Sequence, residues 1–191
     1  MNVLVIQGHP DEESYNVALG RAYIKGARAA GAAVEELVVS KLPFDPNLHF
    51  GYRKRTELEP CLLKAQELIR WADHLVIVHP IWWGSLPALL KGFFDRVFLP
   101  GFAFKKREGS LFWDKYLTGK SARIICTADQ PGWFYRLRYQ RPSHYALKAL
   151  TLEYCGIKPV KNTFVGPIRL SKDSFRASWL EKVQKLGREL K

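Results

Sequence analysis

The sequence is poor in cysteine and shows no metal-binding pattern. Its three cysteines, Cys61, Cys126 and Cys155, are far apart and include no CxxC spacing, and its five histidines show no HxxH or HExxH spacing. An odd number of scattered thiols argues against a disulfide framework, and without a ligand pattern no metal site is predicted. We therefore expect buried free thiols in a reducing compartment, and hence a cytoplasmic protein.

Long uninterrupted apolar runs are also missing. The most apolar stretch, residues 81–104, contains Lys91, Asp95 and Arg96 and is broken by prolines, so it is not predicted to span a membrane. The first ten residues have neither a basic segment nor a small-residue cleavage site, so no secretory signal peptide is predicted.

Acidic residues are scarce relative to basic ones. Lys and Arg total 30 against 18 Asp and Glu, for a net charge of +12, and half of the excess lies in residues 100–141. Such a basic region can bind nucleic acid, an acidic membrane surface or an anionic small molecule, or it can simply be a solvated face. Charge alone does not choose between these.

What the chain does contain is enough apolar sequence for a core. Apolar residues make up 47% of its 191 residues, which argues against disorder and predicts one domain over residues 1–191. Short apolar runs predict strands at 2–6, 33–39, 74–79, 122–127 and 161–165. Helical periodicity predicts helices at 14–30, 57–71, 87–97, 142–155 and 173–190.

This alternation predicts an α/β fold. Strands that alternate with helices indicate a parallel, doubly wound sheet with helices on both faces, and five strands fit the flavodoxin-like order 2-1-3-4-5. Residues 99–120 are expected to be irregular. In the first helix, Ala18, Ala22 and Gly26 form a small-residue stripe that is expected to lie close to the sheet.

Ligands of such folds bind beyond the carboxyl ends of the strands. The loops after the first, third and fourth strands are "QGHPDEESYN", "HPIWWGSLP" and "TADQPGWFYR". They are also the least ordinary segments of the chain, so the ligand site is predicted there.

The first of these loops leads into a helix at Ser14. A helix start offers free backbone N–H groups and a partial positive charge, which suit a phosphate, although a plain helix cap at Ser14 explains the same residues. The loop has neither GxGxxG nor the P-loop pattern. Because Asp11, Glu12 and Glu13 would repel a phosphate, we expect their carboxylates to face away from the pocket and His9 to face it.

The other two loops are aromatic. Trp82 and Trp83 are read as core residues if taken alone, but a rigid Trp-Trp-Gly-Ser turn can also form a flat wall for a planar ring. The third loop mixes aromatic residues, including Trp133, with arginines, a pattern that also describes a platform for single-stranded nucleic acid. Both alternatives stay open at this point.

Three stretches in order along the chain resemble the NAD(P)H:quinone oxidoreductase family of flavodoxin-like flavoproteins. They are "GHPDEESYN", "HPIWWGSLPALLKGFFDRVFLPGFAF" and "LEYCGIKPV", and the likeness runs from residue 3 to about residue 165. The family includes DT-diaphorase-like enzymes and ancillary oxidoreductase subunits of potassium-efflux systems. The resemblance implies a homodimer that transfers a hydride from NAD(P)H through a bound flavin to quinone-like acceptors, with ping-pong kinetics. The alternative that it leaves open is a regulatory subunit of a membrane transporter.

The resemblance also implies roles for particular residues. The flavin phosphate would be held by His9, Ser14, Tyr15, Asn16 and Val17, and the isoalloxazine ring would contact Pro80, Ile81, Trp82 and Trp83. The pyrimidine end of the ring would meet Thr127, Ala128, Asp129 and Gln130. Catalytic roles would fall to Tyr135 and Arg141, and Trp133 would add to the aromatic walls. The short chain and its compact loop at 40–57 favour FMN over FAD.

One departure from the family bears on the site. The family's third loop reads Thr-Thr-Gly-Gly, whereas this chain has Thr127, Ala128, Asp129 and Gln130. Glycines let backbone amides approach a ligand closely, and an acid at this place would oppose negative charge on the reduced flavin. We therefore expect Asp129 to point away or to pair with a nearby arginine.

Overall fold

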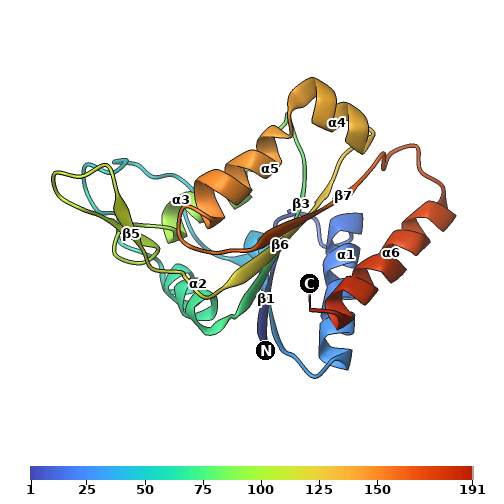
Figure 1. Cartoon of the computed structure of the whole chain (residues 1–191), viewed down its shortest axis with the longest axis horizontal. Helices are drawn as coiled ribbons and strands as arrows, with labels where there is room; N and C mark the ends of the chain where they lie inside the picture. Colours follow the sequence, from blue (N-terminus) through green and yellow to red (C-terminus); the bar gives the residue numbers. More distant parts are fainter. Residues whose placement is uncertain (191) are drawn as a thin grey trace.

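A five-stranded parallel sheet forms the centre of the protein, seen in a computed structural model that describes residues 1–190 (Figure 1). The strand order is β2-β1-β3-β6-β7, which confirms the predicted flavodoxin-like order 2-1-3-4-5. The strands are β1 (Asn2–Gln7), β2 (Ala33–Val38), β3 (His74–Pro80), β6 (Ser121–Thr127) and β7 (Val160–Val165).

The central strand β3 is buried along its whole length. It pairs with β1 on one side, where Val3 lies opposite His74, and with β6 on the other, where His79 lies opposite Cys126. A strand covered on both faces needs apolar residues at every position rather than at alternate ones, which explains the continuous apolar runs in the sequence.

Helices cover both faces of the sheet (Figure 1). The core on one face joins the strands to α1 (Tyr15–Ala29) and α6 (Asp173–Arg188). The core on the other face joins them to α2 (Pro60–Trp71), α3 (Ala88–Val97), and α5 (Pro142–Leu147) with the π turn η2 (Lys148–Leu152). Within residues 1–190, no helix combines the length and the apolar character that crossing a bilayer requires.

In the small-residue stripe of α1, Gly26 packs against α6 and not against the sheet as expected. A Cβ on Gly26 would lie 2.0 Å from the backbone oxygen of Gln184 in α6, and a Cβ on Gly187 would lie 2.2 Å from the backbone oxygen of Tyr23 in α1. The two glycines therefore let the helices α1 and α6 cross with their backbones in contact. The sequence showed that the residue in the stripe is small but did not show that α6 packs against it.

The long loop between the 3-10 turn η1 (Val39–Lys41) and α2 is fixed by a buried arginine. Arg96 of α3 is only 1% exposed, pairs with Glu59 at 2.7 Å, and donates to the backbone oxygens of Asp45 and Glu57. These acceptors satisfy both terminal nitrogens of the guanidinium, and the loss of Glu59 would leave a buried charge without its counter-ion. This contact holds the loop against α3.

Two segments have more regular structure than the sequence predicted. Residues 99–120 contain a short antiparallel hairpin, β4 (Phe104–Lys106) and β5 (Trp113–Lys115). The loop after β6 contains the helix α4 (Gly132–Tyr139). Its apolar residues are exposed on one side and buried on another, so they do not form the single buried stripe by which a helix is recognised in a sequence.

Candidate active site

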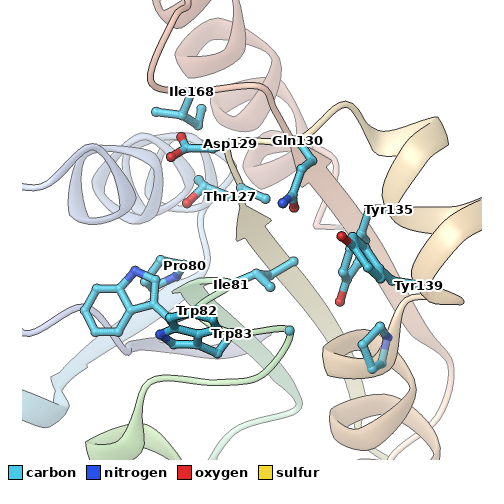
Figure 2. Close-up of a pocket in the computed structure, with 13 residues that line it drawn as sticks. Pro80, Ile81, Trp82, Trp83, Thr127, Asp129, Gln130, Tyr135, Tyr139 and Ile168 are labelled. Atoms are coloured by element: carbon cyan, nitrogen blue, oxygen red, sulfur yellow. The ribbon is translucent and has the colours of Figure 1, made fainter.

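A cavity of about 810 Å³ lies at the carboxyl ends of β3 and β6, where the sequence predicted a ligand site (Figure 2). Trp82 and Trp83 lie on one side, and Tyr135 and Tyr139 of α4 lie on the other. The complete lining is Pro80, Ile81, Trp82, Trp83, Gly84, Thr127, Ala128, Asp129, Gln130, Tyr135, Tyr139, Pro142 and Ile168. The second and third predicted loops thus meet at one cavity.

The tryptophans sit on a tight turn. The backbone groups of Trp82 and Ser85 bond each other in both directions, at 3.1 and 2.9 Å. The two residues between them, Trp83 and Gly84, have φ angles of 50° and 76°, as in a type I′ turn. A tryptophan in the left-handed region is strained, and such strain concentrates at functional sites.

The side chain of Trp83 is fully exposed, and that of Trp82 is 43% exposed. The alternative that this pair belongs to the hydrophobic core is therefore wrong. Because neither ring supports the core, the turn presents them at the edge of the cavity as a separate aromatic wall.

The start of α1 is tied to the cavity by a buried hydrogen bond. Asn16 donates from Nδ2 to Thr127 Oγ1 at 3.0 Å, and Thr127 lines the cavity. Ser14 caps the helix by accepting from the Val17 backbone N–H at 3.4 Å. Among residues 1–190, no partner is found for the backbone N–H groups of Tyr15 and Asn16, as is usual in a first helical turn. The hydroxyl of Tyr15 donates instead to the Arg176 backbone oxygen at 2.7 Å.

The acids of the first loop lie away from the cavity. Glu12 forms an ion pair with Lys41 at 2.8 Å, and the Asp11 carboxylate accepts the backbone N–H of Glu13 at 2.9 Å. The His9 ring accepts the Asp11 backbone N–H at 3.0 Å and meets the Trp82 ring edge-on, with 5.5 Å between ring centroids. His9 therefore supports the tryptophan wall, although it does not itself line the cavity.

Asp129, the residue that departs from the family pattern, is paired. Its carboxylate accepts the Arg169 backbone N–H at 3.0 Å and lies 3.9 Å from Arg169 Nε. Figure 2 shows Asp129 beside Ile168, at the far end of the cavity from the tryptophans. The expected pairing with an arginine is confirmed.

The backbone of this loop is also held in place. Ala128 donates to the Val165 backbone oxygen and accepts from the Ile168 N–H, both at 3.1 Å. Where the family has glycines, this chain therefore has a loop whose backbone is fixed by the end of β7 and by the segment that follows it.

Tyr135 lines the cavity but is almost completely buried. Its hydroxyl accepts the Ser143 backbone N–H at 3.1 Å, and its ring stacks on Phe164 with 5.4 Å between centroids. Burial raises the pKa of this phenol, although the bonds from Ser143 and His144 oppose the shift. Tyr135 is therefore a protonated phenol whose oxygen is held by the Ser143 backbone N–H.

A neutral histidine lies beneath the cavity. His79 is fully buried, its Nδ1 donates to the Pro80 backbone oxygen at 2.9 Å, and burial lowers its pKa to about 4. A neutral imidazole places no charge beneath the site.

Two residues that were expected in the active site lie outside the large cavity. Trp133 and Arg141 line a second, shallow cavity of about 450 Å³ on the opposite side of α4. Trp133 is therefore not part of the aromatic wall, and the place expected for it is taken by Tyr139. The sequence carried a signal for Tyr139, since it follows Tyr135 by four residues and so shares its helix face.

A cavity at the carboxyl ends of a parallel sheet in this order defines a flavodoxin-like protein, and the family with the flavodoxin-like fold matches residues 1–190. The chain belongs to that family. Within it, the chain groups with the NAD(P)H:quinone oxidoreductases, as the resemblance in the sequence suggested.

Named relatives show how far the likeness reaches. The ribosyldihydronicotinamide dehydrogenase-like protein traD of Penicillium crustosum is 31% identical over 158 residues, which cover 70% of this chain and 58% of the relative. An uncharacterized NAD(P)H oxidoreductase of Haemophilus influenzae is 26% identical over 188 residues, which cover 95% of this chain and 91% of the relative.

A solved structure matches the fold along its whole length. The crystal structure of Smu.1420 from Streptococcus mutans UA159 is 33% identical to this chain, with a TM-score of 0.88. The match covers 99% of this chain and 100% of that one.

Proposed function

We propose that this protein is a flavin-dependent NAD(P)H oxidoreductase that passes a hydride to quinone-like acceptors. The observation that carries the proposal is the cavity between the Trp82–Ser85 turn and the Tyr135–Tyr139 face of α4. The Asn16–Thr127 hydrogen bond joins that cavity to the free N–H groups at the start of α1. An aromatic slot next to an anion-binding helix start suits a cofactor with a planar ring and a phosphate.

The residues present fit a flavin. Its ring would lie against Pro80, Ile81, Trp82 and Trp83, and its phosphate would accept from the N–H groups of Tyr15 and Asn16. Arg169 offsets the charge of Asp129, so the third loop is compatible with an electron-rich ring. When bound, the flavin would supply hydride transfer, from NAD(P)H to the acceptor, in two ping-pong half-reactions.

FMN is the flavin that we propose. The loop before α2 is held close to α3 by Arg96 and Glu59 rather than extended. The cavity volume of about 810 Å³ is within the usual range of roughly 300–1,000 Å³ for small-molecule sites. We place the protein in the cytoplasm, where its free cysteines would remain reduced.

The protein's own contribution to the chemistry would be positioning and proton supply. The tryptophan turn would fix the plane in which the nicotinamide and the acceptor stack in succession. Tyr135 would donate its phenolic proton toward charge that develops in the cavity, while the backbone N–H of Ser143 holds its oxygen in place. Arg141 faces the other side of α4, so we assign no proton step to it.

Replacing Tyr135 with Phe tests this role. We expect cofactor reduction by NAD(P)H to slow by roughly tenfold or more, because a positioned proton donor commonly contributes more than that. Rapid-mixing absorbance measures the rate. Tyr139→Phe is the matched control, since it changes the other phenol of the same wall. An unchanged rate in Tyr135→Phe would remove this residue from the mechanism. A thermal melt checks that the Ser143 N–H, left without its acceptor, has not destabilised the fold.

We also propose that two copies of the chain associate. An apolar groove of about 590 Å³ lies between α3, β4 and the α5–η2 segment. Its lining includes Leu86, Phe94, Phe98, Leu150 and Tyr154, and Leu150 is 61% exposed. An apolar groove open to solvent is typical of an association surface.

The decisive experiment is flavin binding by the purified protein. We expect the protein to be yellow, to release FMN on denaturation, and to bind added FMN with quenched fluorescence more tightly than FAD. Light scattering should give twice the 22.0 kDa mass of the chain. If neither flavin binds at roughly micromolar concentration, the proposed function is wrong. A mass of one chain would contradict only the dimer.

The relatives carry oxidoreductase names, so neither a transporter subunit nor a nucleic-acid-binding protein finds support among them.

A further inference from the structure

The outer face of α4 carries exposed side chains that the proposed active site does not use. Trp133 and Leu137 are 66% and 74% exposed and lie four residues apart, so they share one face of the helix. Arg136 and Arg141 are exposed and line the same hollow as these two residues, and the exposed Arg138 lies over the Tyr139 ring, 5.8 Å from its centroid. We call Trp133, Leu137 and these three arginines the α4 surface.

The α4 helix separates this surface from the active-site cavity. Tyr139 lines the large cavity, whereas Trp133, Arg136, Leu137 and Arg141 line the shallow hollow, and the buried Tyr135 lies between the two. In Figure 1, α4 lies at the upper edge of the molecule, beyond the sheet. A partner on the α4 surface would therefore lie next to the active site.

The three arginines of the α4 surface have no acidic partner among residues 1–190. Residues 130–152 contain no Asp or Glu. The hollow is completed by Asn162 and Phe164 of β7, which add no acid, and the nearby Asp129 is held by Arg169. The surface therefore suits an anionic partner.

A second copy of the chain does not match this surface. A twofold axis through it would bring the arginines of both copies together, with no acid in the segment to offset them. The apolar groove proposed for the dimer shares no residue with the α4 surface. The two surfaces are thus available to different partners.

An anionic phospholipid bilayer matches both the apolar and the basic side chains of the α4 surface. Tryptophan and leucine insert at the boundary between headgroups and acyl chains, and arginines beside them bind lipid phosphates. We propose that the α4 surface docks the protein reversibly on an anionic phospholipid bilayer. Docking does not depend on the proposed function. One consequence of docking does rest on the proposed function, namely that a lipophilic quinone would reach the cavity from the bilayer.

Vesicle co-sedimentation of the full chain tests the proposal. Vesicles of phosphatidylcholine with roughly a third phosphatidylglycerol should bind the protein at least tenfold more tightly than pure phosphatidylcholine. The difference should shrink as salt is raised from about 50 to 500 mM, because the attraction is screened.

Matched variants locate the site. Arg136→Gln with Arg138→Gln should weaken vesicle binding about thirtyfold, since each cation near an anionic surface contributes a factor of about five. Arg21→Gln with Lys25→Gln removes the same charge from α1 and should weaken binding less than twofold. Trp133→Ser with Leu137→Ser should weaken binding about tenfold, while turnover of a water-soluble quinone is unchanged.

The proposal is overturned if anionic vesicles bind no better than neutral ones, or if the α4 variants bind as the α1 control does. It is also overturned if Trp133→Ser with Leu137→Ser halves the mass in solution, which would make a second copy the occupant. Binding of an oligonucleotide, with no vesicle binding, would make nucleic acid the occupant. Flavin binding is measured on the same samples, so its failure alone would count against the proposed function and not against docking.

Discussion

Replacing Gly26 with Val is expected to prevent stable folding, at a cost of about 4 kcal/mol or more. A Cβ at this position lies 2.0 Å from the Gln184 backbone oxygen and 2.9 Å from the Arg188 nitrogen. Both atoms are backbone, so no side-chain rotation relieves the overlap. The helices α1 and α6 would have to separate, which opens the core that they share with the sheet.

Urea unfolding followed by circular dichroism measures this loss. Gly26→Ala isolates the contact, because helix propensity alone would make it about 1 kcal/mol more stable. Ala29→Val on the exposed face of the same helix is the control and should cost no more than about 1 kcal/mol. If Gly26→Val unfolds at the same urea concentration as the control, the helices are not in backbone contact.

Replacing Trp83 with Ala is expected to weaken flavin binding by ten- to a hundredfold while the fold remains intact. This prediction rests on the proposed function. Stacking of a heterocyclic ring on an aromatic side chain contributes about 1–3 kcal/mol, which sets the size of the effect. The melting temperature should not change, because the Trp83 side chain is fully exposed and supports no core contact.

Fluorescence titration with FMN measures the affinity, and a thermal melt checks the fold. Trp83→Phe should recover most of the affinity, since it restores an aromatic face. Trp133→Ala is the matched control, because it removes an exposed tryptophan that lies outside the cavity. Unchanged affinity in Trp83→Ala would remove the turn from the cofactor site, and a lost fold would make Trp83 a structural residue.

The three loops of the site were predictable because of how parallel strands are built. Buried parallel strands are apolar at every position, so their ends are visible in the sequence as the points where polar and aromatic residues begin. The carboxyl ends of such strands meet at one edge of the sheet. This is why "HPIWWGSLP" and "TADQPGWFYR" could be brought together without a structure.

Side-chain directions were predictable only in part. Asp129 was expected to point away or to pair with an arginine, but its partner, Arg169, lies 40 residues further along the chain. From the sequence, the tryptophan pair could belong either to the hydrophobic core or to a wall of the cavity. Its position depends on the φ angles of its turn, which the amino-acid sequence does not show. The helix α4 was missed, since its apolar residues lie on its exposed side as well as on its buried side.

The sequence by itself determined the fold class, the edge of the sheet that holds the site, and most of the residues that reach it. The fold class and the edge of the sheet follow from local periodicity and from the geometry of parallel strands, whereas the individual residues follow from the resemblance to the family. Only the tertiary structure decided that Gly26 faces α6 and not the sheet, that Tyr139 lines the cavity, and that Trp133 faces outward. The reason is physical, because each of these features depends on packing between segments that are remote in the sequence. The periodicity of one segment does not show which side chains of another segment will pack against it.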